Sequence, residues 1–434
     1  MSLALQTEND PLAYRPRVVD RDLAELLSVL PAVSIEGPRA AGKTRTACEH
    51  ADTVYNLDDP DVLREVSADP RMLLEGRHPI LIDEWQRFPP SWDLVRRAVD
   101  DNFAPGRFIL TGSVRPGEAP THSGAGRIVT LRMWTMTLSE LWGEHSVSLR
   151  SLLSGDQQPL DAATEVSLED YADVIVGGGF PGWHTTSGRA RRLLVDGYLH
   201  RIVEHDLPLA GRAVRNPAAL RYWLQAYAAA TSTTASYESI RDAATAGEHN
   251  KPAKTTTSAY RDALQALWVL EPLPAWLPPT GNRLSRLKRS PKHHLTDTSL
   301  AVRLLGVTEE TLLGVNTTTI NPQHSDKPIM GALFESLVTR DLRVYAQSCD
   351  STVCHLRSWS GAREVDLIVG HEQGILAIEV KLASEVQQRD TQHLQWLRDR
   401  IGPALLDAVV VTTGSRAYRD NNGIAIIPAA LLGP

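Results

Sequence analysis

The feature that most constrains the fold is a glycine-rich stretch between an apolar segment and a helix-forming one. Residues 32–35 are typical of a buried strand, and a match to G-x-x-x-x-G-K-T follows, Gly37-Pro38-Arg39-Ala40-Ala41-Gly42-Lys43-Thr44. In such a loop the backbone N–H groups converge on phosphates, the lysine adds positive charge and the hydroxyl binds Mg²⁺. Residues 45–50 contain no helix breaker, so a helix can begin with its positive dipole end facing the anion. The stretch predicts a site for ATP and Mg²⁺; the alternative is a chance glycine-rich turn.

A second candidate feature is an apolar strand that ends in two carboxylates, Asp83 and Glu84. In a P-loop enzyme an acid at the end of a neighbouring strand completes the magnesium shell, and the next acid can polarise the attacking water. We therefore expect Asp83 to bind Mg²⁺ and Glu84 to act in catalysis. The alternative is a surface acidic pair, which is common at strand ends.

Polar residues also follow the strand predicted at residues 107–113. Thr111 or Ser113 could hydrogen-bond the attacking water or the γ-phosphate, although a Thr-Gly-Ser sequence is also common in turns at the ends of strands. Arg127 could reach a γ-phosphate in its own or a neighbouring subunit, or it could be a solvated loop arginine. Strands that alternate with helices predict an α/β fold with a parallel sheet, whose ligand lies at the carboxyl ends of the strands.

The composition is that of an ordinary globular protein with several domains. The chain has 434 residues, of which 42% are hydrophobic and 22% charged, and length alone favours about three domains. A net charge of −7 argues against nucleic acid coating the whole surface but leaves room for a local basic face. Three irregularly spaced cysteines indicate neither a disulfide framework nor zinc, so we expect a reducing cytoplasm. No segment reads as a secretory signal or a membrane span, and we expect no membrane partner.

The middle of the chain is predicted to be helical and then to contain a helix-turn-helix with a wing. Helices are expected over residues 168–230, 237–244 and 253–267, followed by strands at 267–273 and 293–297. A basic loop joins these strands, and it would present its cations to phosphates together with those of the second helix. The cations concerned are Lys251, Lys254, Arg261, Arg283, Arg286, Lys288, Arg289 and Lys292. DNA is therefore a possible partner; the alternative is a packing or protein-contact module.

The last hundred residues contain a pattern of carboxylates and a lysine on strands. In Glu379-Val380-Lys381 the alternation of a strand sends Glu379 and Lys381 to the same face. Asp366, on the preceding strand, and Glu379 could share a Mg²⁺, while Lys381 orients a water or stabilises charge on a phosphate. Such triplets also occur by chance in amphipathic strands.

Taken together, these motifs resemble those of bacterial and archaeal AAA+ family ATPases that carry a C-terminal restriction-endonuclease-like domain. The resemblance runs from about residue 17 to 428 and rests on the following motifs: the loop at Gly37, Ile82-Asp83-Glu84-Trp85-Gln86, Leu110-Thr111-Gly112-Ser113, Gly126-Arg127 and Gly178-Gly179-Phe180-Pro181. It implies a helical lid on the nucleotide domain. It also implies that Asp366, Glu379 and Lys381 form the D…E-x-K core of a PD-(D/E)xK nuclease, with Glu335 as an additional helical glutamate.

These inferences define four expected domains: an AAA+ P-loop ATPase domain (1–165), a helical lid (166–230), a winged-helix-like domain (231–325) and a C-terminal α/β endonuclease-like domain (326–434). The leading hypothesis is a cytoplasmic ATPase, possible as an oligomer, that couples ATP to nucleic-acid binding or metal-dependent cleavage. One rival is a nucleotide-gated signalling or scaffold protein whose last domain only binds a partner. A second rival, a small-molecule kinase, fits less well because adjacent acids suit water activation.

Overall fold

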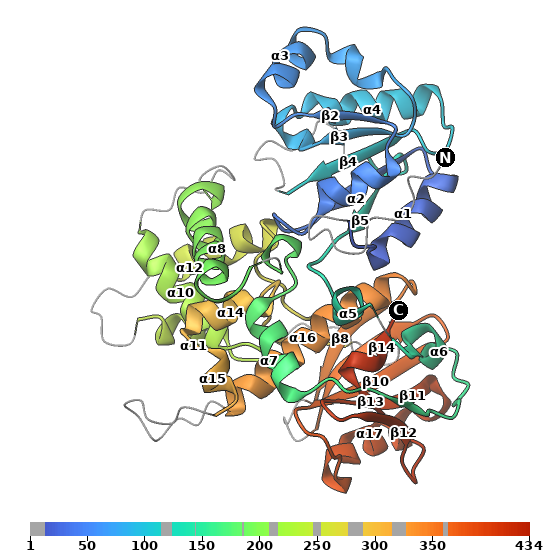
Figure 1. Ribbon diagram of the computed structural model, residues 1–434, viewed down its shortest axis with the longest axis vertical. Helices are drawn as coiled ribbons and strands as arrows, with labels where there is room; N and C mark the ends of the chain where they lie inside the picture. Colours follow the sequence, from blue (N-terminus) through green and yellow to red (C-terminus); the bar gives the residue numbers. More distant parts are fainter. Residues whose placement is uncertain are drawn as a thin grey trace, which may run out of the picture.

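The computed structural model describes residues 14–113, 124–143, 145–184, 186–207, 216–245, 253–276, 290–314, 327–358 and 363–434. Figure 1 shows three parts: an N-terminal sheet domain, a helical middle region and a C-terminal sheet domain. Among the described residues, no helix combines the length and the apolar character that crossing a membrane requires.

The N-terminal domain is built on a five-stranded sheet in which every neighbouring pair is parallel, in the order β2-β3-β4-β1-β5. Its strands are β1 (Ala32–Glu36), β2 (Thr53–Asn56), β3 (Ile80–Asp83), β4 (Phe108–Gly112) and β5 (Ile128–Arg132). The main helices are α1 (Val18–Val29), α2 (Lys43–His50), α3 (Pro60–Ala68) and α4 (Pro90–Asp101). The predicted parallel sheet of an α/β fold is confirmed.

Apolar residues on these strands pack in two separate cores, one on each face of the sheet. Along β4, Ile109 packs in the core that contains residues of α1 and α2, whereas Phe108 and Leu110 pack in the core that contains residues of α4. Successive side chains of a strand point to opposite faces, so a strand covered by helices on both faces is apolar throughout.

The segment after β5 leaves the N-terminal domain and joins the C-terminal one. It contains α5 (Leu138–Trp142), β6 (Val147–Ser148), α6 (Leu149–Leu153) and β7 (Ala162–Ala163). β6 pairs with β14 (Leu432–Gly433), and β7 pairs with β12 (Arg416–Arg419). The structure thus differs from the expected first domain at 1–165, because these short strands find their hydrogen-bond partners more than 200 residues away.

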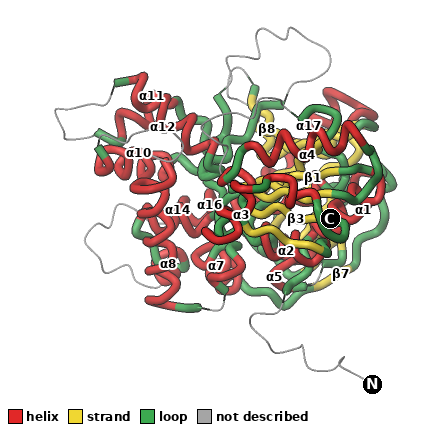
Figure 2. Tube along the Cα trace, turned by 90° about the horizontal axis from the view of Figure 1, so that it is seen from above, coloured by secondary structure: helices red, strands yellow, loops and turns green. Residues whose placement is uncertain are grey.

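The middle region is a block of helices that lies beside the two sheets when the molecule is seen from above (Figure 2). The helices are α7 (Leu168–Gly177), α8 (Gly188–Arg201), the π-helix η4 (Ile202–Asp206), α10 (Pro217–Ala229), α11 (Tyr237–Ala243), α12 (Lys254–Ala266), α14 (Thr298–Leu305) and α15 (Glu309–Leu312). The two predicted strands are reduced to antiparallel bridges, Leu270 with Leu295 and Leu273 with Lys292. Most of the predicted basic wing, Arg283, Arg286, Lys288 and Arg289, lies outside the described residues, as does Lys251.

The C-terminal domain has a seven-stranded mixed sheet in the order β7-β12-β13-β11-β10-β9-β8. Its elements are α16 (Lys327–Gln347), β8 (Thr352–Arg357), β9 (Glu364–His371), β10 (Gly374–Lys381), α17 (Gln388–Ile401), β11 (Leu405–Thr412), β12, β13 (Ala425–Pro428) and β14. β8, β9 and β10 are antiparallel neighbours, and β11 runs parallel to β10. A parallel neighbour needs a crossover connection, which α17 supplies.

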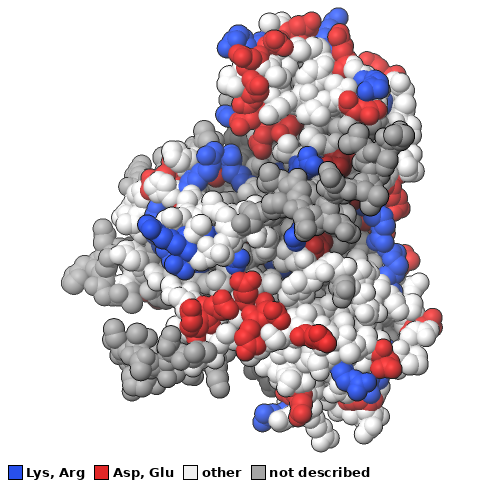
Figure 3. Space-filling view, in the orientation of Figure 1, with Lys and Arg blue, Asp and Glu red and all other residues white. Residues whose placement is uncertain are grey.

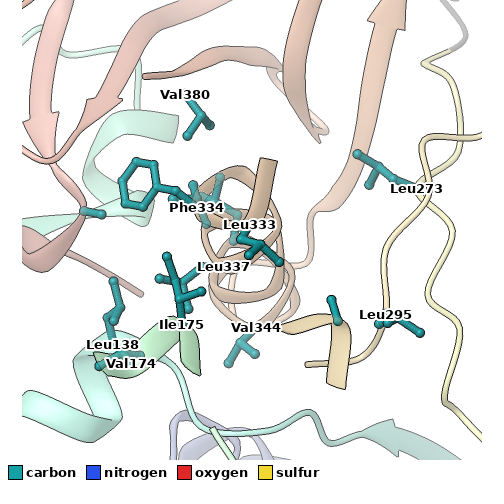
Figure 4. Close-up of a cluster of buried hydrophobic side chains, with 14 of the residues drawn as sticks. Leu138, Val174, Ile175, Leu273, Leu295, Leu333, Phe334, Leu337, Val344 and Val380 are labelled. Carbon is teal, nitrogen blue, oxygen red and sulfur yellow. The ribbon is translucent and has the colours of Figure 1, made fainter. Parts of the chain in front are cut away.

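Helix α16 is the central packing element of the molecule. In Figures 1 and 2 it lies between the helical block and the sheets. Figure 4 shows Leu333, Phe334 and Leu337 of this helix among side chains from distant segments, including Ile175 of α7 and Val380 of β10. A helix that is apolar around most of its circumference must be buried on most sides. One continuous core therefore joins the middle region to the C-terminal domain.

A buried ionic network also ties the middle region to α16 and α5. Arg340 of α16 contacts the carboxylate of Asp341 at 2.8 Å and that of Asp297 at 3.5 Å. The other oxygen of Asp341 accepts a 2.9 Å hydrogen bond from the backbone of Leu138 in α5. Asp297 accepts a bond of 2.8 Å from the backbone N–H of Gly179. The Gly-Gly-Phe-Pro motif is thus part of this network, because a Cβ at Gly178 or Gly179 would collide with it.

Candidate functional site

The glycine-rich loop joins the carboxyl end of β1 to the start of α2. Gly42, directly before α2, has a φ of 102°, which other residues rarely adopt. A Cβ at Gly37 would collide with the carbonyl oxygen of Met133, in the segment after β5. Gly37 therefore allows the loop to lie close to Met133, and Gly42 allows the chain to turn into α2. The first backbone N–H groups of α2 lie at the carboxyl ends of the strands.

Lys43 is buried at the base of this loop. Its Nζ donates hydrogen bonds to the carbonyl oxygens of Gly37 at 3.0 Å and Pro38 at 2.8 Å. Burial lowers the pKa of Lys43 to about 8. The loop carbonyls thus hold an ammonium that a phosphate, being a stronger acceptor, could draw away.

Three side chains from three different elements meet beside the loop. Thr44 Oγ1 donates to Asp83 Oδ1 at 2.9 Å, and Thr111 Oγ1 of β4 donates to the same oxygen. Burial raises the pKa of the Asp83 carboxyl. A hydroxyl and a carboxylate side by side are hard oxygen ligands of the kind Mg²⁺ prefers. Thr44 and Asp83 therefore fit a magnesium site, with Thr111 positioning the carboxylate.

Glu84 follows Asp83 in a left-handed conformation, with a φ of 54°. This is a strained region for a residue other than glycine, and such strain gathers at functional sites. Ser113 Oγ donates to its carboxylate at 3.0 Å, and Gln86 Nε2 donates to the other oxygen. The strained backbone and the two donors together hold the Glu84 carboxylate in one orientation. Gln86 had no role in the sequence-based prediction, although it lies in the motif that contains Glu84.

The middle region touches the loop directly. Arg39 Nε lies 3.4 Å from Asp206 Oδ1 of η4, and Tyr198 Oη of α8 donates to the Arg39 carbonyl oxygen at 3.5 Å. Burial raises the pKa of Asp206. Sequence reasoning missed Asp206 and Tyr198, because neither lies in a local motif. A change in the position of Arg39 would therefore alter the contacts that α8 and η4 make with the loop.

A second cation, Arg132, lies at the carboxyl end of β5, level with Glu36 at the end of β1. It is paired with Glu271 of the middle region, and its guanidinium stacks 3.5 Å above the ring of Trp268. Burial lowers the pKa of Arg132 to about 10. The positive charge of Arg132 also acts to lower the pKa of Lys43, so it belongs to the electrostatic environment of the loop. No sequence motif marks this residue.

Arg127 lies at the amino end of β5, whereas the loop lies at the carboxyl ends of the strands. It precedes β5, whose amino end pairs with the amino end of β1, and its Nε contacts Asp100 Oδ1 at 2.7 Å. Five strand residues separate it from the loop edge, which corresponds to about 16 Å. Arg127 therefore does not reach the loop of its own chain, and a role across a subunit boundary stays a prediction.

The predicted carboxylates and lysine of the C-terminal domain come together. Lys381 Nζ lies 2.8 Å from Glu379 Oε2 and 3.8 Å from Asp366 Oδ2. The backbone N–H of Val380 donates to Asp366 Oδ2 at 3.0 Å, which fixes β9 against β10 at this point. The structure therefore brings together the three residues of the predicted D…E-x-K pattern.

A fourth group, Lys292, enters this cluster from the middle region. Its Nζ lies 2.8 Å from Glu335 Oε1 of α16 and 3.2 Å from Asp366 Oδ1. It also lies 3.5 Å from Glu364 Oε1, two residues before Asp366 on β9. Lys292 is only 1% exposed, so the prediction that it contacts DNA from a wing is wrong. The spacing of Glu364 and Asp366 on one strand face is a signal that could have extended the site.

Charge interactions dominate this cluster. Burial, with the neighbouring Asp366 carboxylate, raises the pKa of Glu335 to about 8 and raises that of Glu379. Against the effect of burial, the ammonium groups of Lys292 and Lys381 lower the pKa of Asp366. Within the described residues, no group of three or more His, Cys, Asp or Glu is arranged to hold a metal. The residues present do not fit the metal site that the nuclease resemblance implies, because an ammonium lies between the carboxylates.

Three family models match separate parts of the chain. Residues 30–142 match a model described as an AAA domain. These residues are therefore similar to an AAA domain. Residues 168–311 and 330–432 match two models described as domains of unknown function, DUF8612 and DUF4143. The first match implies nucleotide binding and supports the AAA part of the predicted resemblance, whereas ATP hydrolysis stays a prediction. The endonuclease-like part stays a prediction.

The curated relatives carry no assigned function. The uncharacterized proteins Rv2008c of Mycobacterium tuberculosis and Mb2031c of Mycobacterium bovis are each 30% identical to this chain over 330 residues. The match covers 74% of this chain and 64% of each relative. The chain therefore spans less than two thirds of the length of the curated relatives it matches.

Solved structures of low similarity include nucleotide-binding proteins. The Walker-type ATPase paby2304 of Pyrococcus abyssi matches 68% of this chain and 99% of its own, at 15% identity and a TM-score of 0.40. The Aeropyrum pernix ORC2 protein, in its ADPNP–ADP complexes, matches 71% of this chain and 98% of its own, at 14% identity and a TM-score of 0.29. The replication initiator DnaA, bound to AMPPCP and single-stranded DNA, matches 59% of this chain and 90% of its own, at 16% identity and a TM-score of 0.27. TM-scores this low carry no argument about function.

Proposed function

We propose that this protein binds Mg-ATP at the Gly37–Thr44 loop and hydrolyses it. The observation that carries the proposal is the meeting of Thr44, Asp83 and Thr111 at one carboxylate oxygen, beside a buried Lys43. A glycine-rich turn without function would not need a lysine and a hydroxyl from α2, an acid from β3 and a second hydroxyl from β4 at one point.

Each residue has a separate role in the proposed reaction. Lys43 moves its hydrogen bonds from the loop carbonyls to the β- and γ-phosphates, while Thr44 and Asp83 supply oxygen ligands for Mg²⁺, which neutralises phosphate charge when bound. Glu84, held by Ser113 and Gln86, accepts a hydrogen bond from the attacking water and orients it. Backbone N–H groups at the start of α2 complete the phosphate cradle.

The decisive test is substitution of Glu84 by Gln, which keeps the shape of the side chain but removes the acceptor charge. The turnover number should fall by roughly 10²–10⁴-fold while ATP still binds, because water orientation is lost but the phosphate contacts remain. Glu65→Gln, an exposed acid on α3, is the matched control and should turn over ATP normally. Phosphate release measured under single-turnover conditions gives the result, and unchanged turnover in Glu84→Gln would remove Glu84 from this role.

We further propose that the helices around α8 and η4 act as a lid. Their contacts to the loop through Arg39 support this role, because a charged phosphate entering the loop would compete with Asp206 for the arginine. Movement of the lid would then be passed to the winged-helix-like part of the middle region.

Nucleic-acid binding is the second candidate function, and the middle region is its proposed surface. Lys and Arg side chains gather over the helical block on the face shown in Figure 3. Arg261 lies 4.8 Å from the ring centroid of Tyr237, at a cleft that Lys254 and Arg241 also line. Cations beside an aromatic ring are suited to phosphate contact and base stacking. We do not propose cleavage, because the C-terminal cluster does not fit a metal.

ATP turnover with and without DNA, followed by analysis of the strands on a gel in Mg²⁺ and Mn²⁺, separates these functions. Binding without cleavage, abolished by Arg261→Ala, is expected. Turnover and binding that ignore DNA entirely would favour the signalling or scaffold protein, whose last domain only contacts a partner.

A further inference from the structure

The ammonium of Lys292 lies where several carboxylates converge. It contacts Glu335, Asp366 and Glu364, three side chains carried by two elements of the C-terminal domain. An ammonium has three N–H donors, and here each has a carboxylate oxygen within 3.5 Å. Lys292 is therefore the cation that pairs with these three carboxylates.

The backbone of Lys292 holds this ammonium in place. Lys292 exchanges backbone hydrogen bonds with Leu273, at 2.8 and 3.0 Å. The next residue, His293, bonds to Ser232 and Thr233 at 2.8 and 2.9 Å. The main chain is paired on both sides and the side chain is only 1% exposed, so Lys292 is held with its ammonium inside the cluster.

A divalent cation held by Asp366 and Glu379 would share the Asp366 carboxylate with Lys292. Mg²⁺ binds oxygen at about 2.0–2.1 Å, so on this carboxylate it would lie close to the Lys292 ammonium, whose Nζ is 3.2 Å from Asp366 Oδ1. Two cations at such short range repel each other strongly in a site shielded from water. One carboxylate oxygen, Glu379 Oε1, is buried and accepts no hydrogen bond from any described residue. The cluster thus retains acceptor capacity, but its central position is taken.

We propose that Lys292 replaces the divalent cation in a nuclease-like site and converts it into an ionic joint between the middle region and the C-terminal domain. The cluster of the native chain then binds no divalent metal, and the carboxylates serve to hold Lys292. This inference rests on the contacts of Lys292 and is independent of ATP hydrolysis.

Removal of the ammonium should restore a metal site. In Lys292→Met the carboxylates of Glu335, Glu364, Asp366 and Glu379 remain, and the chain should gain one bound Mn²⁺ that the wild type lacks. Mn²⁺ binding is counted by electron paramagnetic resonance on the full chain without nucleotide. Lys292→Met/Asp366→Asn should lose the gain, which assigns it to this cluster rather than to the loop at Thr44. Arg64→Met, which removes a cation from an exposed pair with Asp61, should gain nothing.

Three outcomes would overturn the proposal. The first is Mn²⁺ binding by the wild type that Asp366→Asn abolishes, and the second is a folded Lys292→Met that gains no ion. Because Lys292→Met leaves buried carboxylates unpaired, Lys292→Met/Glu335→Gln, which removes one charge of each sign, is tested in parallel and should also gain Mn²⁺. Failure of both variants to fold in millimolar Mn²⁺ is the third contrary outcome, since an ion held by the cluster would stabilise the fold.

Discussion

Removal of the Arg340 guanidinium should destabilise the whole molecule. Arg340 is fully buried between Asp297 and Asp341, and its partners tie α16 to Gly179 and to Leu138. In Arg340→Met two buried carboxylates lose their cation. Breaking a buried pair in this way costs about 3–5 kcal/mol, because the remaining charge is left without compensation.

The cost should depend on pH, with a sign fixed by Asp341. Burial raises the pKa of Asp341 from 3.8 to about 6 even with Arg340 present, and loss of the guanidinium should raise it further. A folded-state pKa above the unfolded value means that the native state binds the proton more tightly. The penalty is therefore absent below the unfolded pKa and grows as the pH rises through the folded one. Arg340→Met should be destabilised less at pH 5.5 than at pH 8.

Unfolding by guanidinium chloride at both pH values, followed by tryptophan fluorescence, measures the free energy of unfolding. Arg64→Met is the control, since its exposed pair should contribute less than about 1 kcal/mol at either pH. A loss below 1 kcal/mol in Arg340→Met at pH 8, or a larger loss at pH 5.5 than at pH 8, would refute the reasoning.

Two further substitutions test the loop itself. Gly37→Ala should lower ATP affinity roughly a hundredfold, because the new Cβ meets the backbone of Met133 and displaces the phosphate cradle by a fraction of an ångström or more; Gly197→Ala, which has room for a Cβ, should bind fluorescent ATP normally. Arg39→Met should abolish the change in hydrogen exchange of α8 and η4 that ATP is expected to cause, and a preserved response would show that Arg39 does not link loop and lid.

The parts of the site that sequence reasoning predicted are those encoded by short, local patterns. Lys43 and Thr44 lie in one loop, and Asp83 lies at the end of an apolar run, so strand direction alone brings them to one edge of the sheet. Glu379 and Lys381 follow from the alternation of a single strand. In each of these cases the local sequence is enough to predict where the side chain lies, without information on distant contacts.

The parts that were missed depend on contacts between distant segments. Lys292 lies in a basic stretch that favoured a DNA-binding wing, and only the pairing of its strand turns it toward Asp366, 74 residues later. The pairing of β6 with β14 shifts the domain boundary for the same reason. Arg340 stands beside Asp341 inside an otherwise apolar helix, and that was a usable signal, since adjacent charges in a buried segment need partners.

The two sites of this protein are connected by a short series of contacts. Arg132, beside the loop, pairs with Glu271, and two residues further Leu273 forms the bridge that holds Lys292 in the carboxylate cluster. Arg343 of α16 contacts Glu271 at 3.4 Å from the other side. Such a series transmits a signal only if one of its elements has two arrangements that a ligand can bias. The nucleotide would act on it through Arg132, because new phosphate charge near the loop competes with Glu271 for that guanidinium.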